Sequence, residues 1–320
     1  MDEIDISGKL AFFDAGQGKW CALTDECFIA LNPEAEINEE SQKQVIEAKE
    51  RVQSILSGSL KLPNLSFFAG SGTSLGEVGG PSMGDLWKKS MWVNHEAEPQ
   101  DSDYGQLHEI ATRVMEKVRY QELENPNIEH FLSHCEAFLQ FDHDDEVLGY
   151  VRDVKETILF ECSDFLDQAT ANISSYQMLL QKLARRRVRD PRLKVFTTNY
   201  DMCFETAASE LGMMVVDGFS YSRKRKFNGQ YFNYDVVKRE EDSHEFVEGV
   251  FKLFKLHGSV SWTREGNSIF ESHEVAPDNA ALIYPAKGKY QQAFVQPYLE
   301  LRSYRFHLIT KWSLCHNFSV

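Results

Sequence analysis

Three short apolar segments of this chain each run straight into a cluster of glycine, hydroxyl, amide or imidazole side chains. They read LSFFAGSG at 65–72, LKVFTTNYD at 193–201 and VFKLFKLHGS at 250–259. Short apolar runs bounded by turn residues predict strands, and helical patterns separate these three. The sequence therefore predicts an α/β fold with a doubly wound, mostly parallel sheet, in which ligands bind beyond the carboxyl ends of the strands. Two further apolar runs, at 213–219 and 281–286, are expected to add strands.

The longest segment without a strand pattern lies between the first and second of these runs. Residues 84–187 carry apolar side chains at helical spacing. A crossover between parallel strands needs only about a dozen residues, so we expect a helical subdomain that covers a cleft. The chain before the first strand reads as an irregular or strand-rich leader and then a helix over 36–56. The expected organisation is a leader and helix over 1–60 and an α/β domain over 61–300.

Composition argues against several classes of protein. Of the 320 residues, 42% are hydrophobic and 26% are charged, as in ordinary globular proteins, and no apolar stretch approaches the length of a membrane span. The formal net charge of -15 argues against direct binding to nucleic acid. The acidic amino terminus lacks the pattern of a secretory signal, so we expect no membrane contact and a cytoplasmic location. The cysteines form no C-x-x-C pair, which indicates neither a disulfide framework nor a zinc ribbon.

The first polar cluster is a glycine-rich turn, AGSGTSLGEVGGPSMG at 69–84. Gly70 and Gly72 follow the strand directly and let the backbone approach a phosphate closely. The turn matches neither G-x-G-x-x-G nor the Walker loop, and a purely structural turn is the alternative. Residues 80–84 match the G-x-S-x-G motif of serine hydrolases, but no apolar strand directly precedes Ser82, as that motif requires.

The second and third clusters put an amide, a carboxylate and an imidazole at strand ends. Asn199 can orient a water molecule or bond to a ribose, and Asp201 can order the loop that holds Asn199. The alternative for Asp201 is an Asx turn that caps the next helix. His257 precedes Gly258 and Ser259 and is expected to project from the functional edge of the sheet, although a lone histidine is more often structural.

Other clusters carry weaker signals. His130 and His134 lie one helical turn apart, but HFLSH lacks the glutamate of H-E-x-x-H, and a solvated helix face is the better interpretation. The basic runs at 184–192 and 222–227 are interpreted as surface patches or subunit contacts.

Taken in order, these motifs resemble the sirtuin-like superfamily. The family's G-A-G-x-S turn looks like Gly70-Ser71-Gly72-Thr73-Ser74, and its G-x-P-S looks like Gly79-Gly80-Pro81-Ser82. Its T-x-N-x-D motif looks like Thr197-Thr198-Asn199-Tyr200-Asp201, and its K-L-H-G-S strand end is found at 255–259. NIEHFLS at 127–133 is similar to a helix in the bacterial defence members. The resemblance covers the whole expected α/β domain.

The resemblance implies a Rossmann-like domain that binds NAD. The implied catalytic residues are Asn199, which places the water or the ribose, His257, which is the base, and Asp201, which orders the Asn199 loop. The implied NAD-binding residues are the glycine turn and the residues around the other two motifs: Gly70, Ser71, Gly72, Thr73, Ser74, Pro81, Ser82, Thr198, Asn199, Asp201, Gly258 and Ser259.

Two departures select a branch of the superfamily. Its protein deacylases carry two C-x-x-C pairs that hold a structural zinc, and these are absent here, while a long helical insertion takes their place. The chain looks like the bacterial antiviral branch, which implies an NAD+ glycohydrolase that depletes NAD in anti-phage defence. The resemblance also implies a homo-oligomer or a partner such as a HerA-type ATPase, and no zinc. The alternatives are a non-catalytic sensor of NAD or ADP-ribose, a protein deacylase, or a serine hydrolase that uses Ser82.

Residues 301–320 depart from the family pattern. Members commonly continue with a strand of the form G-[YF]-S-[FL] and a helix, whereas this chain ends in SYRFHLITKWSLCHNFSV. A divergent last strand, a truncation and a change of reading frame near Leu301 are the alternatives. Each bears on whether the adenosine side of the expected pocket is complete.

Overall fold

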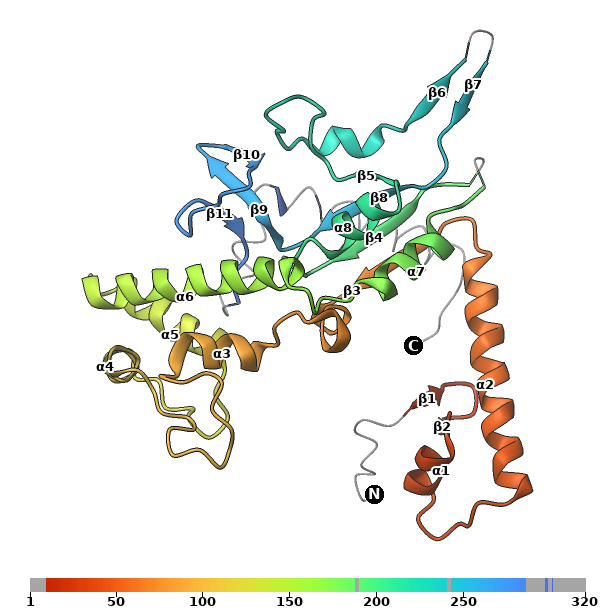
Figure 1. Cartoon of the computed structure of the whole chain (residues 1–320), viewed down its shortest axis with the longest axis horizontal. Helices are drawn as coiled ribbons and strands as arrows, with labels where there is room; N and C mark the ends of the chain where they lie inside the picture. Colours follow the sequence, from red (N-terminus) through yellow and green to blue (C-terminus); the bar gives the residue numbers. More distant parts are fainter. Residues whose placement is uncertain (1–9, 188–189, 241–242, 286–296, 299–300, 302–320) are drawn as a thin grey trace. The chain divides into compact units, whose positions relative to one another are not determined.

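The computed structural model describes residues 10–187, 190–240, 243–285, 297–298 and 301 (Figure 1). The chain divides into two compact units, residues 1–65 and 66–320. Residues 302–320 lie outside the described residues, as do the expectations that concern them.

The first unit is a strand hairpin with two helices. Strands β1 (Ala11–Asp14) and β2 (Lys19–Ala22) pair antiparallel, and helices α1 (Asp25–Leu31) and α2 (Glu39–Leu60) follow. The helix expected over 36–56 is confirmed as α2. It begins at Glu39 because the Asn38 side chain accepts a hydrogen bond from the Ser41 amide, which satisfies an otherwise unpaired donor.

The second unit is built on a parallel four-stranded sheet. Its strands are β3 (Ser66–Ala69), β4 (Leu193–Thr197), β5 (Met214–Val216) and β8 (Val250–Lys255). They lie in the order β3-β4-β8-β5, and every neighbouring pair is parallel. The expectation of a mixed α/β fold with a parallel sheet is therefore confirmed, and the three apolar runs that end in polar clusters are three adjacent strands.

Both faces of this sheet are covered, which explains why most residues of the central strands β4 and β8 are apolar. Successive side chains of a strand point to opposite faces. On one face, Phe67 contacts Phe204 of helix α8 (Cys203–Glu210) edge-on. On the other face, Phe196 stacks on Phe254, and Phe254 stacks on Phe232 of the short helix η4 (Gly229–Asn233).

A helical segment separates β3 from β4, as the sequence predicts. Helix α6 packs against α3, α4 and α5, while α7 packs against α8 (Figure 1). The buried cores of α3 to α6 form one cluster that includes Trp87, Met115, Phe131 and Ile158. The helices are α3 (Met83–Met91), α4 (Glu109–Lys117), α5 (Ile128–Leu139), α6 (Asp145–Asp164), η3 (Phe165–Asp167) and α7 (Ser174–Leu183).

The strand expected at 281–286 occurs as a shorter strand, which lies outside the parallel sheet. Strand β11 (Ala280–Leu282) instead pairs antiparallel with β9 (Gly258–Glu265), and β9 also pairs with β10 (Ser268–Glu271). An apolar run alone does not distinguish a central parallel strand from one in a small antiparallel sheet.

Two other elements differ from the expectation. The strand expected at 213–219 is shorter, because Gly218 turns the chain with a φ of 87° directly after β5. The hairpin of β6 (Val237–Arg239) and β7 (His244–Phe246) has no counterpart in the prediction. Among the helices of the described residues, none is both long enough and apolar enough to cross a bilayer.

Candidate active site

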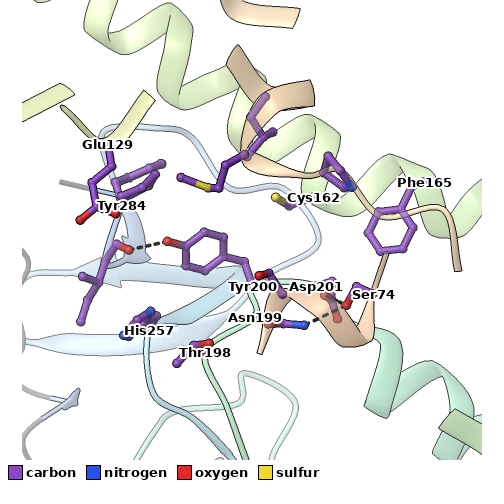
Figure 2. Close-up of a pocket in the computed structure, with 16 residues that line it drawn as sticks. Ser74, Glu129, Cys162, Phe165, Thr198, Asn199, Tyr200, Asp201, His257 and Tyr284 are labelled. Carbon is purple, nitrogen blue, oxygen red and sulfur yellow. Dashed lines mark hydrogen bonds between the residues drawn. The ribbon is translucent and has the colours of Figure 1, made fainter. Parts of the chain in front are cut away.

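Three strands of the parallel sheet end level with one another. Ala69, Thr197 and Lys255 are register partners at the ends of β3, β4 and β8. The residue two places beyond each of these ends lines a single pocket of about 230 Å³ (Figure 2). These residues are Ser71, Asn199 and His257. The sheet register therefore brings one residue of each predicted motif to the same cavity, at the edge where α/β sheets bind ligands.

The pocket has two contrasting walls. The ends of the parallel strands supply most of its polar groups, and the helical segment and the residues after β11 supply mainly apolar ones. The lining from the strand ends and their loops contains Ser71, Ser74, Thr198, Asn199, Tyr200, Asp201 and His257. The remaining lining residues are Pro81, Met83, Leu86, Glu129, Cys162, Phe165, Ile283, Tyr284 and Pro285.

A chain of hydrogen bonds fixes the orientation of the Asn199 amide. Ser74 Oγ donates to Asp201 Oδ2 at 2.7 Å, and Thr73 Oγ1 donates to the Gly70 carbonyl at 2.8 Å. Each hydroxyl has only one hydrogen, so both must accept from Asn199 Nδ2, at distances of 2.8 and 3.2 Å. The Asn199 nitrogen is thereby directed at the glycine turn. Its oxygen, Oδ1, has no hydrogen bond within the described residues and remains an acceptor for a ligand.

Tyr176 of α7 completes this network. Its hydroxyl lies 2.9 Å from Thr73 Oγ1 and 2.8 Å from Ser74 Oγ, while its ring packs on Phe204. Burial raises the pKa of Tyr176, and the negative charge of Asp201 raises it further, so the phenol stays protonated. The sequence does not single Tyr176 out, because it lies within an ordinary helical pattern far from any motif.

Asp201 has both of the roles that the sequence left open. Its Oδ1 accepts from the Cys203 amide at 3.1 Å, which is the Asx bond at the start of α8. Its Oδ2 accepts from Ser74, which in turn holds Asn199. The carboxylate thus supports Asn199 through Ser74 rather than by direct contact.

His257 lies on the pocket wall, but the two residues after it do not. Gly258 has a φ of 88°, and a Cβ there would come within 2.0 Å of the Ala281 carbonyl oxygen. Glycine is therefore required by the backbone and by the close approach of β11. Ser259 is fully buried, and its hydroxyl donates to the Tyr200 carbonyl at 3.3 Å. These two residues shape the wall instead of lining it.

The glycine turn is partly folded around itself and partly open. The Gly80 amide donates to the Ser74 carbonyl at 2.8 Å, and a Cβ on Gly80 would meet that oxygen at 2.6 Å. By contrast, a Cβ on Gly70 would meet only Thr198 Oγ1 at 3.9 Å, and one on Gly72 would meet no atom within 4 Å. The packing of the chain therefore does not require glycine at positions 70 and 72.

Ser82 is a helix cap and does not line the pocket. Its Oγ accepts from the Asp85 amide at 3.1 Å, and the Asp85 carboxylate accepts from the Ser82 amide at 2.8 Å, which forms a capping box at the start of α3. The short helix η2 (Gly76–Val78) and a glycine turn precede it, instead of the strand that a nucleophile elbow requires.

Cys162 is a pocket residue without nucleophilic character. Burial raises the pKa of its thiol to about 12, and the negative charges of Asp201 and Glu161 act in the same direction. Tyr200 also lies in the wall and donates its hydroxyl to the Ile283 carbonyl at 2.6 Å. Cys162 comes from a helix far from any motif, whereas Tyr200 occupies a variable position of the T-x-N-x-D motif.

The histidine pair on α5 has other partners. His130 Nδ1 lies 2.5 Å from Glu122 Oε2, and His134 Nδ1 lies 3.1 Å from the Val118 carbonyl oxygen. No group of three His, Cys, Asp or Glu side chains suited to a metal ion occurs among the described residues.

In comparisons with known proteins, no family model and no curated protein sequence matches this chain.

Proposed function

We propose that this chain is an NAD+ glycohydrolase of the sirtuin-like type, with a Rossmann-like domain that binds NAD at the carboxyl edge of β3, β4 and β8. One observation carries the proposal: Ser71, Asn199 and His257, one from each motif, line a single pocket. The ends of adjacent parallel strands always meet at one edge, and what supports a binding site is that these three ends open onto the same cavity.

The size and the donors of the pocket support a nicotinamide nucleotide. Small-molecule pockets span about 300–1,000 Å³, so a cavity of about 230 Å³ suits the nicotinamide and its ribose better than a whole dinucleotide. The amides of Ser71 and Gly72 make no hydrogen bond within the described residues, and they follow the strand as phosphate-binding amides do. A pyrophosphate close to the backbone would also explain glycine at 70 and 72.

The reaction would divide among the side chains as follows. Breaking the bond between nicotinamide and ribose leaves an electron-poor, oxocarbenium-like carbon on the ribose, which water then attacks. Asn199 Oδ1 accepts a hydrogen bond from that water or from a ribose hydroxyl, and His257 removes the proton of the attacking water. Asp201 holds Ser74, and Ser74 holds Asn199, so the acceptor keeps one direction.

The charge of the pocket favours this transition state. Its described lining includes two carboxylates, Glu129 and Asp201, and no lysine or arginine side chain. A negative lining stabilises a positive centre that develops on the ribose, and it does so most strongly where water is displaced by the ligand. The products are nicotinamide and ADP-ribose.

The biological setting of the proposal rests on the resemblance of the motifs. An enzyme that destroys NAD would act in the bacterial cytoplasm as an effector of anti-phage defence, restrained as a homo-oligomer or by a partner such as a HerA-type ATPase. The acidic net charge of -15 agrees with a protein that acts on a metabolite and does not itself bind nucleic acid.

The test is NAD+ turnover by the full-length protein, followed by separation of nicotinamide and ADP-ribose, over a range of protein concentrations that allows self-assembly. We expect Asn199→Ala and His257→Ala to lower turnover by about 100-fold or more. His244→Ala, which changes an exposed histidine of β7, is the matched control and should leave turnover unchanged. If NAD+ binds tightly but stays intact for hours, the chain is a sensor of NAD and not a hydrolase.

A further inference from the structure

Lys255 is a buried cation directly below the candidate site. It is the last residue of β8, only 2% of its surface is exposed, and it immediately precedes the Leu256-His257 segment that enters the pocket. Moving an ammonium group out of water costs on the order of several kcal/mol unless the protein supplies hydrogen bonds and an opposite charge. Its contacts therefore show what this residue is for.

The ammonium of Lys255 bonds to the loop that carries Asn199. Its Nζ donates to the backbone carbonyl of Asp201 and to Glu205 Oε1 at 3.0 Å, and it lies 3.6 Å from Met202 Sδ. All three partners belong to the turn after β4 or to the first part of α8. A side chain of one strand thus ties down the loop at the end of its neighbour.

This contact extends the connection between β4 and β8 beyond their last register pair. Thr197 and Lys255 are partners, and the Leu256 amide donates to the Thr197 carbonyl at 2.8 Å. On the far side of the loop, the Val260 amide donates to the Tyr200 carbonyl at 3.0 Å. Lys255 adds a third bond at Asp201, the residue after Tyr200, so the segment that carries Asn199 is held to the segment that carries His257 on both sides of Asn199.

Glu205 balances the buried charge at a cost. Burial raises the pKa of its carboxyl group, and the positive charge of Lys255 opposes that shift. Its second oxygen, Oε2, is buried without a hydrogen-bond partner in the structure. A buried ion pair of this kind is weak as a source of stability compared with an apolar pair, and it is retained where it specifies a geometry.

We propose that Lys255 is a positioning residue, which fixes the 198–202 loop against β8 so that Asn199 and His257 keep one arrangement about the pocket. The functional part of this inference rests on the proposed NAD hydrolysis. The geometric part stands independently, because the rigidity of the loop can be measured without any substrate.

The test compares Lys255→Arg, which keeps charge and donors, with the double variant Lys255→Met/Glu205→Leu. The double variant removes both charges, so it leaves no unpaired ion in the interior and is expected to fold. Lys252→Met is the matched control, because Lys252 on the same strand donates to the Phe232 carbonyl, away from the pocket. Hydrogen exchange by mass spectrometry then reports on the amides of Thr198, Asn199 and Cys203, which are bonded in the loop.

We expect the double variant to exchange the 198–203 amides about tenfold faster than wild type, with the β5 amides unchanged. Its kcat for NAD+ should fall about 10- to 100-fold with KM within about threefold, as loss of alignment predicts. Lys255→Arg should keep the exchange rate of the loop amides and kcat close to wild type, and Lys252→Met should change neither quantity. The proposal is overturned if the loop amides of the double variant exchange at the wild-type rate, or if amide exchange accelerates equally across the whole sheet. Absence of NAD+ turnover in wild type would remove the proposed function, while the exchange comparison still decides the role of Lys255.

Discussion

Asn199 and Ser74, which lie 125 positions apart in the chain, are joined by a hydrogen bond of 2.8 Å from the amide nitrogen to the hydroxyl oxygen. The same hydroxyl donates to Asp201, so it cannot donate to Asn199. The bond therefore does more than connect the glycine turn to the loop after β4. It fixes which end of the Asn199 amide faces the pocket, and this makes Ser74 as important to the site as the residues that would touch a substrate.

Replacing Ser74 by alanine tests this role. The variant removes the acceptor for Asn199 Nδ2 and leaves a buried Asp201 oxygen without its donor, which costs about 1–3 kcal/mol of stability. Because Asn199 Nδ2 then keeps only the longer bond of 3.2 Å to Thr73 Oγ1, its amide is held less firmly, and we expect kcat for NAD+ to fall about 10- to 100-fold. The measurements are thermal unfolding and steady-state turnover of the same preparation.

Ser82→Ala is the control for that variant. It removes the cap of α3 and should lower stability by about 0.5–2 kcal/mol, similar to the loss in Ser74→Ala. Its turnover should stay within about twofold of wild type, because Ser82 caps a helix outside the pocket and does not orient any residue that lines the pocket. Equal losses of turnover in the two serine variants would mean that stability, and not the orientation of Asn199, governs the activity.

Tyr176→Phe separates the hydroxyl of Tyr176 from its ring. The ring contact with Phe204, at 4.7 Å between centroids, is kept, and only the bonds to Thr73 and Ser74 are lost. We expect a loss of about 1 kcal/mol in the free energy of unfolding and a smaller fall in kcat than Ser74→Ala produces. A fall in kcat as large as that of Ser74→Ala would instead point to a direct part for the phenol in the reaction.

Local patterns were sufficient to predict the strand ends of the site. The runs before Asn199 and His257 are mainly apolar because β4 and β8 are the central strands of the sheet, and the run before Ser71 is the edge strand β3. Strand type predicts that the ends of parallel strands share one edge, but the adjacency and register of β3, β4 and β8, which bring these residues to one cavity, are visible only in the structure.

The remaining parts of the site depend on packing between distant segments. Tyr176 reaches the site from a helix whose sequence shows only an ordinary amphipathic pattern, and the resemblance of residues 127–133 to a family helix does not identify Glu129 as a pocket residue. Gly258 reads as part of a binding motif, but its conformation and the nearby Ala281 carbonyl explain it fully. Lys255 appears in the sequence only as the first residue of the K-L-H-G-S motif, and the structure shows that it is buried and bonded to the Asp201 loop. Such contacts have no local signature.

Gly70→Ala and Gly258→Ala are expected to fail in different ways. A Cβ at Gly258 would collide with the Ala281 carbonyl at 2.0 Å and would require a φ of 88°, so we expect a loss of about 3 kcal/mol or more. Gly70 has an ordinary backbone, and a Cβ there would lie 3.9 Å from its nearest neighbour, Thr198 Oγ1, so Gly70→Ala should be as stable as wild type. If a phosphate approaches there, its KM for NAD+ should rise about tenfold. Calorimetric unfolding and titration with NAD+ distinguish the two results, and unchanged affinity in Gly70→Ala would argue against phosphate binding at this turn.

The thiol of Cys162 in the pocket offers a final test, because the reactivity of each cysteine can be measured separately. Burial raises the pKa of Cys162 to about 12, so this thiol stays protonated near neutral pH. Burial also raises the pKa of Cys203, with Asp201 adding to the shift, while Cys21 is partly exposed. N-Ethylmaleimide at pH 7.5 should therefore modify Cys21 in the native protein, and Cys162 and Cys203 only after unfolding, as peptide mass spectrometry can determine. Rapid native modification of Cys162 with loss of NAD+ turnover would instead indicate thiol chemistry in the pocket, and it would replace the water-based mechanism with a covalent one.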